Sequence, residues 1–188
     1  SPIPADHSQN LTGIWPKKVV NYKTVMSDAA SGFTSVTYPF PVIRMADLYL
    51  MYAEALNEKG EDYATVLPWI DMVRERSGLQ GVKESWDQYV GNSKYATQTG
   101  LRQIIMQERR IELAFEGHYF WDVRRWKTAT TELTQPLTGW KVRYGETDVD
   151  YYSENLVLVR DFTPKMYFWP IDIGELRKDP NLVQNYGW

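Results

Sequence analysis

Hydrophobic residues recur at helical spacing in two neighbouring segments of the chain. The first segment, 44–59, carries an apolar stripe made of Met45, Leu48, Tyr49, Tyr52, Ala55 and Leu56. This spacing predicts a helix that ends at Gly60, a typical residue after a helix C-terminus. A second helix is predicted over 62–77, with Asp62 as its N-cap. Pro68 lies inside this span and predicts a kink or a delayed start.

A third helix is predicted over 99–116, followed by a short helix at YFWDVRRWK. At 100° per residue, Leu101, Ile104, Ile105 and Phe115 share one face of the third helix. Glu108 and Glu112 fall in the middle of that face. Two carboxylates within an apolar stripe require an explanation, because burying an unpaired charge is costly.

The rest of the chain predicts loops and a few extended pieces. Residues 1–43 are punctuated by prolines and read as irregular, with extended stretches at KKVVNYKTV and TSVTYPF. Residues 79–98 and 128–154 read as loops. NLVLVRDF and KMYFWPI predict two strands joined at Thr163–Pro164, and IDIGELRKDP predicts a last helical turn. The predicted fold is mainly α, with long loops and a minor β hairpin.

The first two predicted helices cover about one tetratricopeptide unit, and LMYAEALNEKGEDYA resembles the consensus of that repeat. A repeat of this kind needs neighbours on which to bury its apolar face. We therefore expect 1–188 to be a single domain that forms the C-terminal portion of a larger protein. Within it, 1–43 is irregular, 44–127 is a helical scaffold, and 128–188 holds loops, short strands and a tail.

Composition narrows the functional classes. A net charge of -3 argues against a nucleic-acid partner. The chain has no cysteine and two histidines, which disfavours thiol chemistry and a histidine-rich metal site, and no cofactor is indicated. Aromatic residues make 14% of the chain, and a surplus of Trp and Tyr is typical of carbohydrate-binding surfaces, where flat rings stack on sugars.

Glu108 and Glu112 have three interpretations. As a catalytic pair they would lie roughly 6 Å apart, a spacing that glycoside hydrolysis permits. A metal site is less favoured, because Glu116 and His118 do not have Glu-x-x-His spacing. The third interpretation is a structural ion network with nearby arginines, which bind carboxylates through two parallel bonds. We favour this network, and its predicted members are Glu108, Glu112, Arg109, Arg110, Asp122 and Arg124. Asp122 is expected to pair with Arg124 or Arg125.

Four segments together resemble one family. They read RMADLYLMYAEALNEKG, IDMVRERSGL, LRQIIMQERRIELAFEGHYFWDVRRW and YFWPIDIGELRKDPNLVQNYGW, in that order. In this combination the chain resembles the C-terminal portion of SusD/RagB-like proteins. The resemblance implies a non-catalytic surface lipoprotein of Bacteroidetes outer membranes, held by a lipid anchor that this chain does not contain. It also implies that glycans, or sometimes peptides, are captured and passed to a TonB-dependent, SusC-like transporter.

Loop aromatics are the candidate ligand-binding residues, because the family motifs belong to the scaffold. The candidates are Trp140, Tyr144, Tyr151, Trp86 and Trp15, with Tyr152 beside them. Aromatics within predicted regular elements, Trp121, Trp126, Trp169 and Tyr49, are instead predicted to be core. The predicted function is oligosaccharide or polysaccharide binding. The alternatives are a tetratricopeptide-type protein–protein scaffold and, third, a glycoside hydrolase using Glu108 and Glu112.

Overall fold

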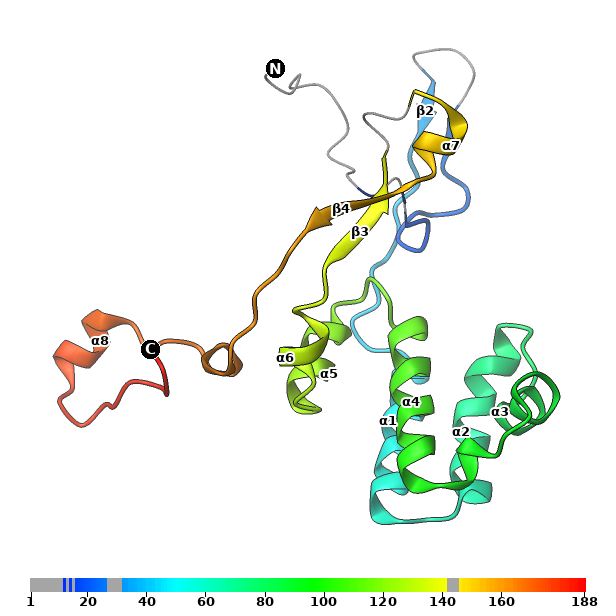
Figure 1. Cartoon of the computed structure of the whole chain (residues 1–188), viewed down its shortest axis with the longest axis horizontal. Coiled ribbons are helices and arrows are strands. Elements are labelled where there is room, and N and C mark those ends of the chain that lie inside the picture. Colours follow the sequence, from blue (N-terminus) through cyan, green and yellow to red (C-terminus); the bar gives the residue numbers. More distant parts are fainter. Residues whose placement is uncertain (1–11, 13, 15, 27–31, 142–145) are drawn as a thin grey trace. The chain divides into compact units, whose positions relative to one another are not determined.

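The computed structural model describes residues 12, 14, 16–26, 32–141 and 146–188 (Figure 1). Contacts within the chain divide it into two compact units. The helical unit is Lys18–Tyr119, and the mixed unit joins Ser1–Lys17 to Phe120–Trp188. The two units are described separately below.

The helical unit is built on a hairpin of α1 (Met45–Lys59) and α2 (Tyr63–Arg76), against which α4 (Gln98–Glu112) packs (Figure 1). Gly60 ends α1 with a φ of 88°, a left-handed conformation that glycine adopts without strain. The Asp62 side chain caps α2 by accepting the Thr65 N–H at 3.0 Å. The first two predicted helices are thereby confirmed, and Pro68 does not delay the start of α2.

The core of this unit lies where the three helices meet. Leu50 of α1, Ile70 of α2 and Ile105 of α4 are fully buried within one cluster. Each such side chain contributes about 1.5–3 kcal/mol through burial. Buried Asn57 ties α1 to α4, because its Nδ2 donates to the Gln98 carbonyl at 3.2 Å and Gln98 Nε2 donates back to the Asn57 carbonyl at 2.7 Å.

The inward faces of two helices differ from those predicted. On α1, the buried positions are Ala46, Asp47, Leu50, Ala53 and Asn57. Three residues of the predicted stripe, Met45, Leu48 and Tyr52, are exposed instead. α1 therefore has a second apolar face that is open to solvent. On α4, Arg109 is the buried charged residue, while Glu108 and Glu112 are only partly buried. Phe115 is exposed and outside the helix, because α4 ends at Glu112 and the backbone at Phe115 turns with a φ of 65°.

The segment between α2 and α4 was predicted as a loop, and that prediction was wrong. It contains α3 (Val82–Ser85), a π-helical turn η1 (Trp86–Val90) and a 3-10 turn η2 (Lys94–Ala96). Val82 and Tyr95 are buried in the core cluster. The Tyr95 hydroxyl donates to Asp87 at 2.8 Å, which satisfies its polar end. Tertiary burial of two apolar residues thus orders a stretch that is polar overall.

Two short strands precede the helices in the helical unit. β1 (Val25–Met26) pairs antiparallel with β2 (Phe33–Thr34). They coincide only with the ends of the predicted extended stretches.

The mixed unit contains α5 (His118–Arg125), in which the unit boundary falls, and α6 (Ala129–Glu132). A two-stranded antiparallel sheet follows, made of β3 (Leu137–Trp140) and β4 (Glu154–Leu158), with α7 (Asp148–Tyr151) between them in sequence (Figure 1). The predicted hairpin at Thr163–Pro164 was wrong. β4 pairs with β3, and Pro164 instead begins a 3-10 turn, η3 (Pro164–Tyr167).

The chain ends in α8 (Ile173–Lys178) and a tail that folds back onto the η3 region. The Trp188 indole N–H donates to the carbonyls of Lys165 and Phe168 at 3.1 and 3.0 Å. Gln184 exchanges two hydrogen bonds of 2.9 Å with the backbone of Ile171. The helical turn predicted near the end of the chain is confirmed.

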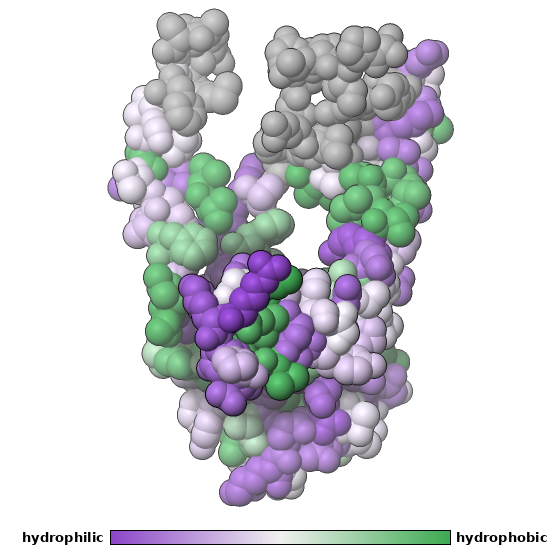
Figure 2. All heavy atoms as spheres, turned by 90° about the vertical axis from the view of Figure 1, so that its left-hand side faces the viewer, coloured by the Kyte–Doolittle hydropathy of each residue, from purple (hydrophilic) through white to green (hydrophobic). Residues whose placement is uncertain are grey.

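Hydrophobic side chains are not confined to the core, and Figure 2 shows them at the surface among hydrophilic ones. Trp121 and Trp169, predicted as core, are 61% and 67% exposed. Tyr49 does pack against the core of the helical unit. Among the described residues, no helix combines the length and the apolar character needed to cross a bilayer.

Candidate functional site

An aromatic cluster lies beside the β3–β4 sheet of the mixed unit. The ring of Tyr152 contacts both Trp140, at a centroid distance of 5.1 Å, and Tyr151, at 5.0 Å. Both contacts are edge-to-face, with interplanar angles of 82° and 81°, a favourable geometry for aromatic pairs. Trp140 and Tyr152 remain 41% and 61% exposed. The cluster therefore offers ring surface to a ligand while its members hold one another in place.

Local structure fixes this cluster. Trp140 ends β3 opposite Glu154 of β4, and the Lys141 N–H donates to the Tyr151 carbonyl at 3.0 Å. Thr147 is the N-cap of α7, and its side chain accepts the Asp150 N–H at 3.2 Å. These bonds bring the last residue of β3 next to the last turn of α7, so that residues distant in sequence share one surface.

A charged pair flanks the rings. Lys141 Nζ lies 2.8 Å from Asp150 Oδ1, and both side chains are about one-third exposed. The hydrogen bond from Lys141 lowers the pKa of Asp150, and the Glu146 N–H, which also donates to this carboxylate, lowers it further. Asp150 thus presents an ionised carboxylate beside a fixed ammonium. Both groups suit the hydroxyls of a sugar.

Gly139 allows a second segment to lie against β3. The Trp140 N–H donates to the Thr12 carbonyl at 3.1 Å, so residue 12 lies along the strand. A Cβ atom at Gly139 would come within 2.6 Å of Thr12 Cα, which no side chain could tolerate without movement of the backbone. A residue without a side chain is needed here for that close approach.

The structure brings together only some of the predicted ligand-binding residues. Trp140 and Tyr151 share the cluster with Tyr152. Trp86 belongs to the helical unit, where it is half-buried against the core. Its ring centroid lies 5.5 Å from Lys94 Nζ. Trp15 and Tyr144 lie outside the described residues. Lys141 was not among the predicted residues. It reaches Asp150 only because the end of β3 lies beside α7, and no local sequence pattern predicts that contact.

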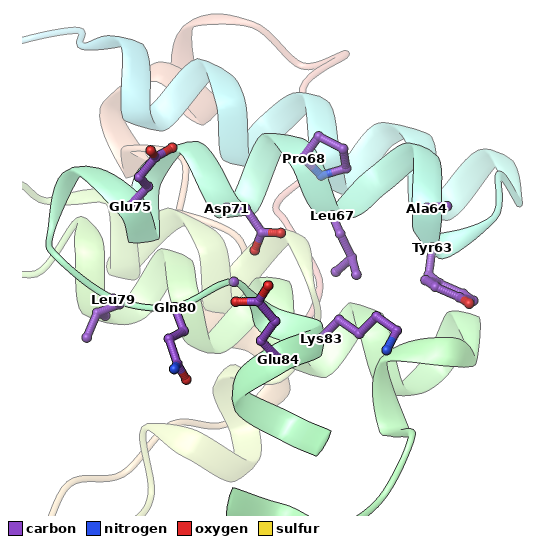
Figure 3. A pocket seen from close by; sticks show the side chains of 11 residues that line it. Tyr63, Ala64, Leu67, Pro68, Asp71, Glu75, Leu79, Gln80, Lys83 and Glu84 are labelled. Carbon is purple, nitrogen blue, oxygen red and sulfur yellow. The ribbon is translucent and has the colours of Figure 1, made fainter. Parts of the chain in front are cut away.

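A hollow of about 570 Å³ lies between α2 and α3 in the helical unit (Figure 3). Asp71 and Glu84 point toward one another across it, with Leu67 and Tyr63 farther along α2. Burial raises the pKa of Asp71, against the effect of the Val82 N–H that donates to it at 2.7 Å. Asp71 therefore already has a structural role, which is to hold the start of α3 against α2.

Arginines contact the carboxylates of α4 that were candidates for catalysis. Glu108 pairs with Arg74, and Glu112 pairs with Arg44 and with Arg76, the latter at 2.7 Å. Both glutamate side chains are 13–14% exposed. Each glutamate thus connects α4 to an arginine of an earlier segment. Arg74 also donates to the Gln80 carbonyl at 2.8 Å.

The ion network extends beyond those two glutamates. Arg44 binds Glu116 through two parallel bonds of 2.7 and 2.8 Å, and Lys18 contacts the same carboxylate at 2.5 Å. Burial alone would raise the pKa of Glu116, but the hydrogen bonds from Arg44 and Lys18 outweigh it and the pKa lies below its usual range. Glu116 was not among the predicted members of the network.

The other predicted network members have separate partners. Arg109 is 3.0 Å from Asp47 in the most deeply buried ion pair of those described, with side chains 3% and 8% exposed. Of the two arginines expected to partner it, Asp122 pairs with Arg125, at 2.8 Å. The Arg110 guanidinium lies over the Tyr119 ring at 5.2 Å. Within the described part of the chain, no group of three or more His, Asp or Glu residues gathers to hold a metal ion.

These features define a mainly helical, tetratricopeptide-like protein whose mixed unit carries an exposed aromatic cluster. The chain belongs to the SusD family, whose family model matches residues 1–188. SusD-like protein P25 of Formosa agariphila is 39% identical over 144 residues, which are 77% of this chain and 23% of that protein.

Solved structures agree with this assignment. A SusD-like protein from Bacteroides fragilis superposes with a TM-score of 0.67 at 28% identity, covering 85% of this chain and 28% of the other. Surface glycan-binding protein A from Bacteroides uniformis superposes with a TM-score of 0.50 at 25% identity, covering 80% of this chain and 28% of the other. The chain thus spans about a quarter of the length of the relatives that it matches.

Proposed function

We propose that this chain binds an oligosaccharide without cleaving it, as part of nutrient capture at a bacterial cell surface. The exposed cluster of Trp140, Tyr151 and Tyr152, in a chain of the SusD family, is the observation that carries the proposal. Aromatic rings stack on the apolar faces of sugars, and the flanking Lys141 and Asp150 can bond to the hydroxyls. The glycan-binding neighbour from Bacteroides uniformis supports the same ligand class.

A binding role agrees with the surroundings of the glutamates on α4. A general acid needs a carboxyl group that faces the substrate and holds a proton near neutral pH. Glu108 and Glu112 instead face guanidinium groups on α1 and α2 or beside them. We therefore assign these two residues to the scaffold and prefer binding over glycoside hydrolysis.

We further propose that the bound glycan passes to a SusC-like, TonB-dependent transporter and that a lipid anchor holds the protein at the outer membrane. Membership in the SusD family supports both statements. The ligand would remain chemically unchanged between capture and transfer.

Calorimetric titration of the 188-residue chain against plant, host and microbial oligosaccharides tests the proposal. Chromatography of the same samples detects cleavage. We expect saturable binding of at least one class and no shortened products. Failure of every oligosaccharide to bind would contradict the proposed function, and products of hydrolysis would favour a glycosidase.

The exposed face of α1 favours a second candidate function, a protein–protein scaffold. Met45, Leu48, Met51 and Tyr52 leave 42–55% of their surface accessible on a helix whose other face is already buried. Exposed apolar patches of this kind mark interaction surfaces. Substituting Leu48 and Met51 with Gln should leave glycan binding unchanged if the two activities are separate, and the same titration measures this.

A further inference from the structure

A second hollow, of about 720 Å³, lies in the mixed unit between α5 and η3. It is lined by Trp121, Arg124, Arg125, Lys127, Tyr167 and Phe168. Trp121 and Phe168 are 61% and 54% exposed, so two aromatic side chains remain accessible to a ligand. The hollow therefore combines aromatic walls with three basic side chains, and none of the described residues that line it is acidic.

Arg124 packs against aromatic rings and has no carboxylate partner among the described residues. Its guanidinium carbon lies 3.5 Å from the centroid of the Phe120 ring and 5.1 Å from that of Phe162. One Nη donates to the Phe120 carbonyl at 3.0 Å, while the Nε is buried and has no hydrogen-bond partner among the residues that the structure describes. Burial also lowers the pKa of Arg124.

The other two cations differ in how well they are neutralised. Arg125 pairs with Asp122 at 2.8 Å and lies over the Trp126 ring. Lys127 follows α5 in a left-handed turn, with a φ of 58°, and no ion pair of the described residues includes it. Arg124 and Lys127 thus leave two positive charges without described counter-charges at the rim of one apolar hollow.

We propose that this hollow binds the charged ring of an acidic oligosaccharide, with the anionic group between Arg124 and Lys127 and the sugar face against Trp121 and Phe168. This inference rests on the proposed glycan-binding function and narrows its ligand class. A planar guanidinium recognises carboxylate and sulfate oxygens through paired hydrogen bonds. Aromatic walls suit the apolar face of the ring to which such a group is attached.

Pairs of oligosaccharides that differ only in charge test the inference by calorimetry on the 188-residue chain. Oligogalacturonate is compared with its methyl ester, and a sulfated oligosaccharide with its desulfated form. We expect the charged member of at least one pair to bind about tenfold more tightly, as a charge-assisted hydrogen bond supplies. The pair that shows the difference identifies carboxylate or sulfate as the recognised group.

Three variants locate the effect. Lys127→Gln should remove most of the preference for the charged member, and Trp121→Ala should weaken both members of the pair. Lys178→Gln, which changes a 72% exposed lysine of α8, is the matched control and should retain the preference. Thermal unfolding of each variant verifies that it remains folded.

Two results would overturn the inference, and they differ in what else they overturn. Equal binding of charged and neutral members, or a preference that survives Lys127→Gln, removes the acidic subsite and leaves the proposed function standing. No binding by any member of these pairs also removes the acidic subsite, and the oligosaccharide panel described above then decides whether the proposed function stands.

Discussion

Charged residues on α4 pair with other segments, and the depth of each pair determines what it contributes. Arg109 and Asp47 are almost fully buried, whereas Arg102 and Glu58 are 38% and 44% exposed. Removing one partner of a buried pair leaves a charge in a poorly solvated site, while exposed pairs are screened by water. Sequence periodicity directed attention to Glu108 and Glu112, but the deepest charge on this helix is that of Arg109.

Asp47→Asn should lower the free energy of unfolding by about 3 kcal/mol, because it removes the negative charge that faces buried Arg109. Glu58→Gln, which breaks an exposed pair with the same chemistry, should cost about 0.5 kcal/mol. Urea unfolding followed by fluorescence measures both. Equal losses in the two variants would contradict the assignment of Arg109–Asp47 as the critical ion pair of the helical unit.

Glu116 should make the stability of the helical unit dependent on pH. Its pKa is lowered in the folded state, so its contribution is present above the unfolded pKa of about 4.3 and disappears as pH falls through the folded pKa. Wild type should therefore exceed Glu116→Gln in unfolding free energy at pH 7, and the gap should close toward pH 3. A gap that stays constant over this range would show that the Glu116 charge is not involved.

At the scale of elements, helices were predictable and the sheet was not. Gly60 and Asp62 mark helix ends through local backbone chemistry, and α1 and α2 follow these signals. The Thr97 side chain caps α4, a signal that the predicted start at residue 99 missed. The β3–β4 pairing joins segments separated by α7, and no nearby residue specifies it. KMYFWPI has strand-like composition, but Pro164 lacks the N–H that a ladder requires and begins a 3-10 turn instead.

Gly139→Ala should disturb the contact between β3 and residue 12. The added methyl group would meet Thr12 Cα at 2.6 Å, and we expect a loss of about 1–3 kcal/mol together with weaker glycan binding. Gly174→Ala in α8 is the control, because its Cβ would meet only the movable carboxylate of Asp172. Thermal unfolding and calorimetry test both variants, and identical behaviour of the two would argue against the close approach at Gly139.

At the scale of the whole molecule, the place of an aromatic residue in the sequence did not predict whether its ring is exposed. Trp140 and Tyr151 meet through Tyr152, but Trp86 packs on the core of the helical unit. Trp121 and Trp169, predicted as core from their place in regular elements, are exposed. Exposure depends on which distant segments cover a ring, and periodicity within one element carries no information about that.

The most direct test of the central claim is the affinity of Trp140→Ala for the oligosaccharide that binds wild type most tightly. Removing a stacking ring should weaken binding at least about tenfold, the scale of one aromatic contact with a ligand. Trp169→Ala removes an indole of the same mixed unit that is more accessible to solvent, at 67% against 41%, and this variant should bind like wild type. Undiminished binding by a folded Trp140→Ala variant would contradict the assignment of the aromatic cluster as the glycan site.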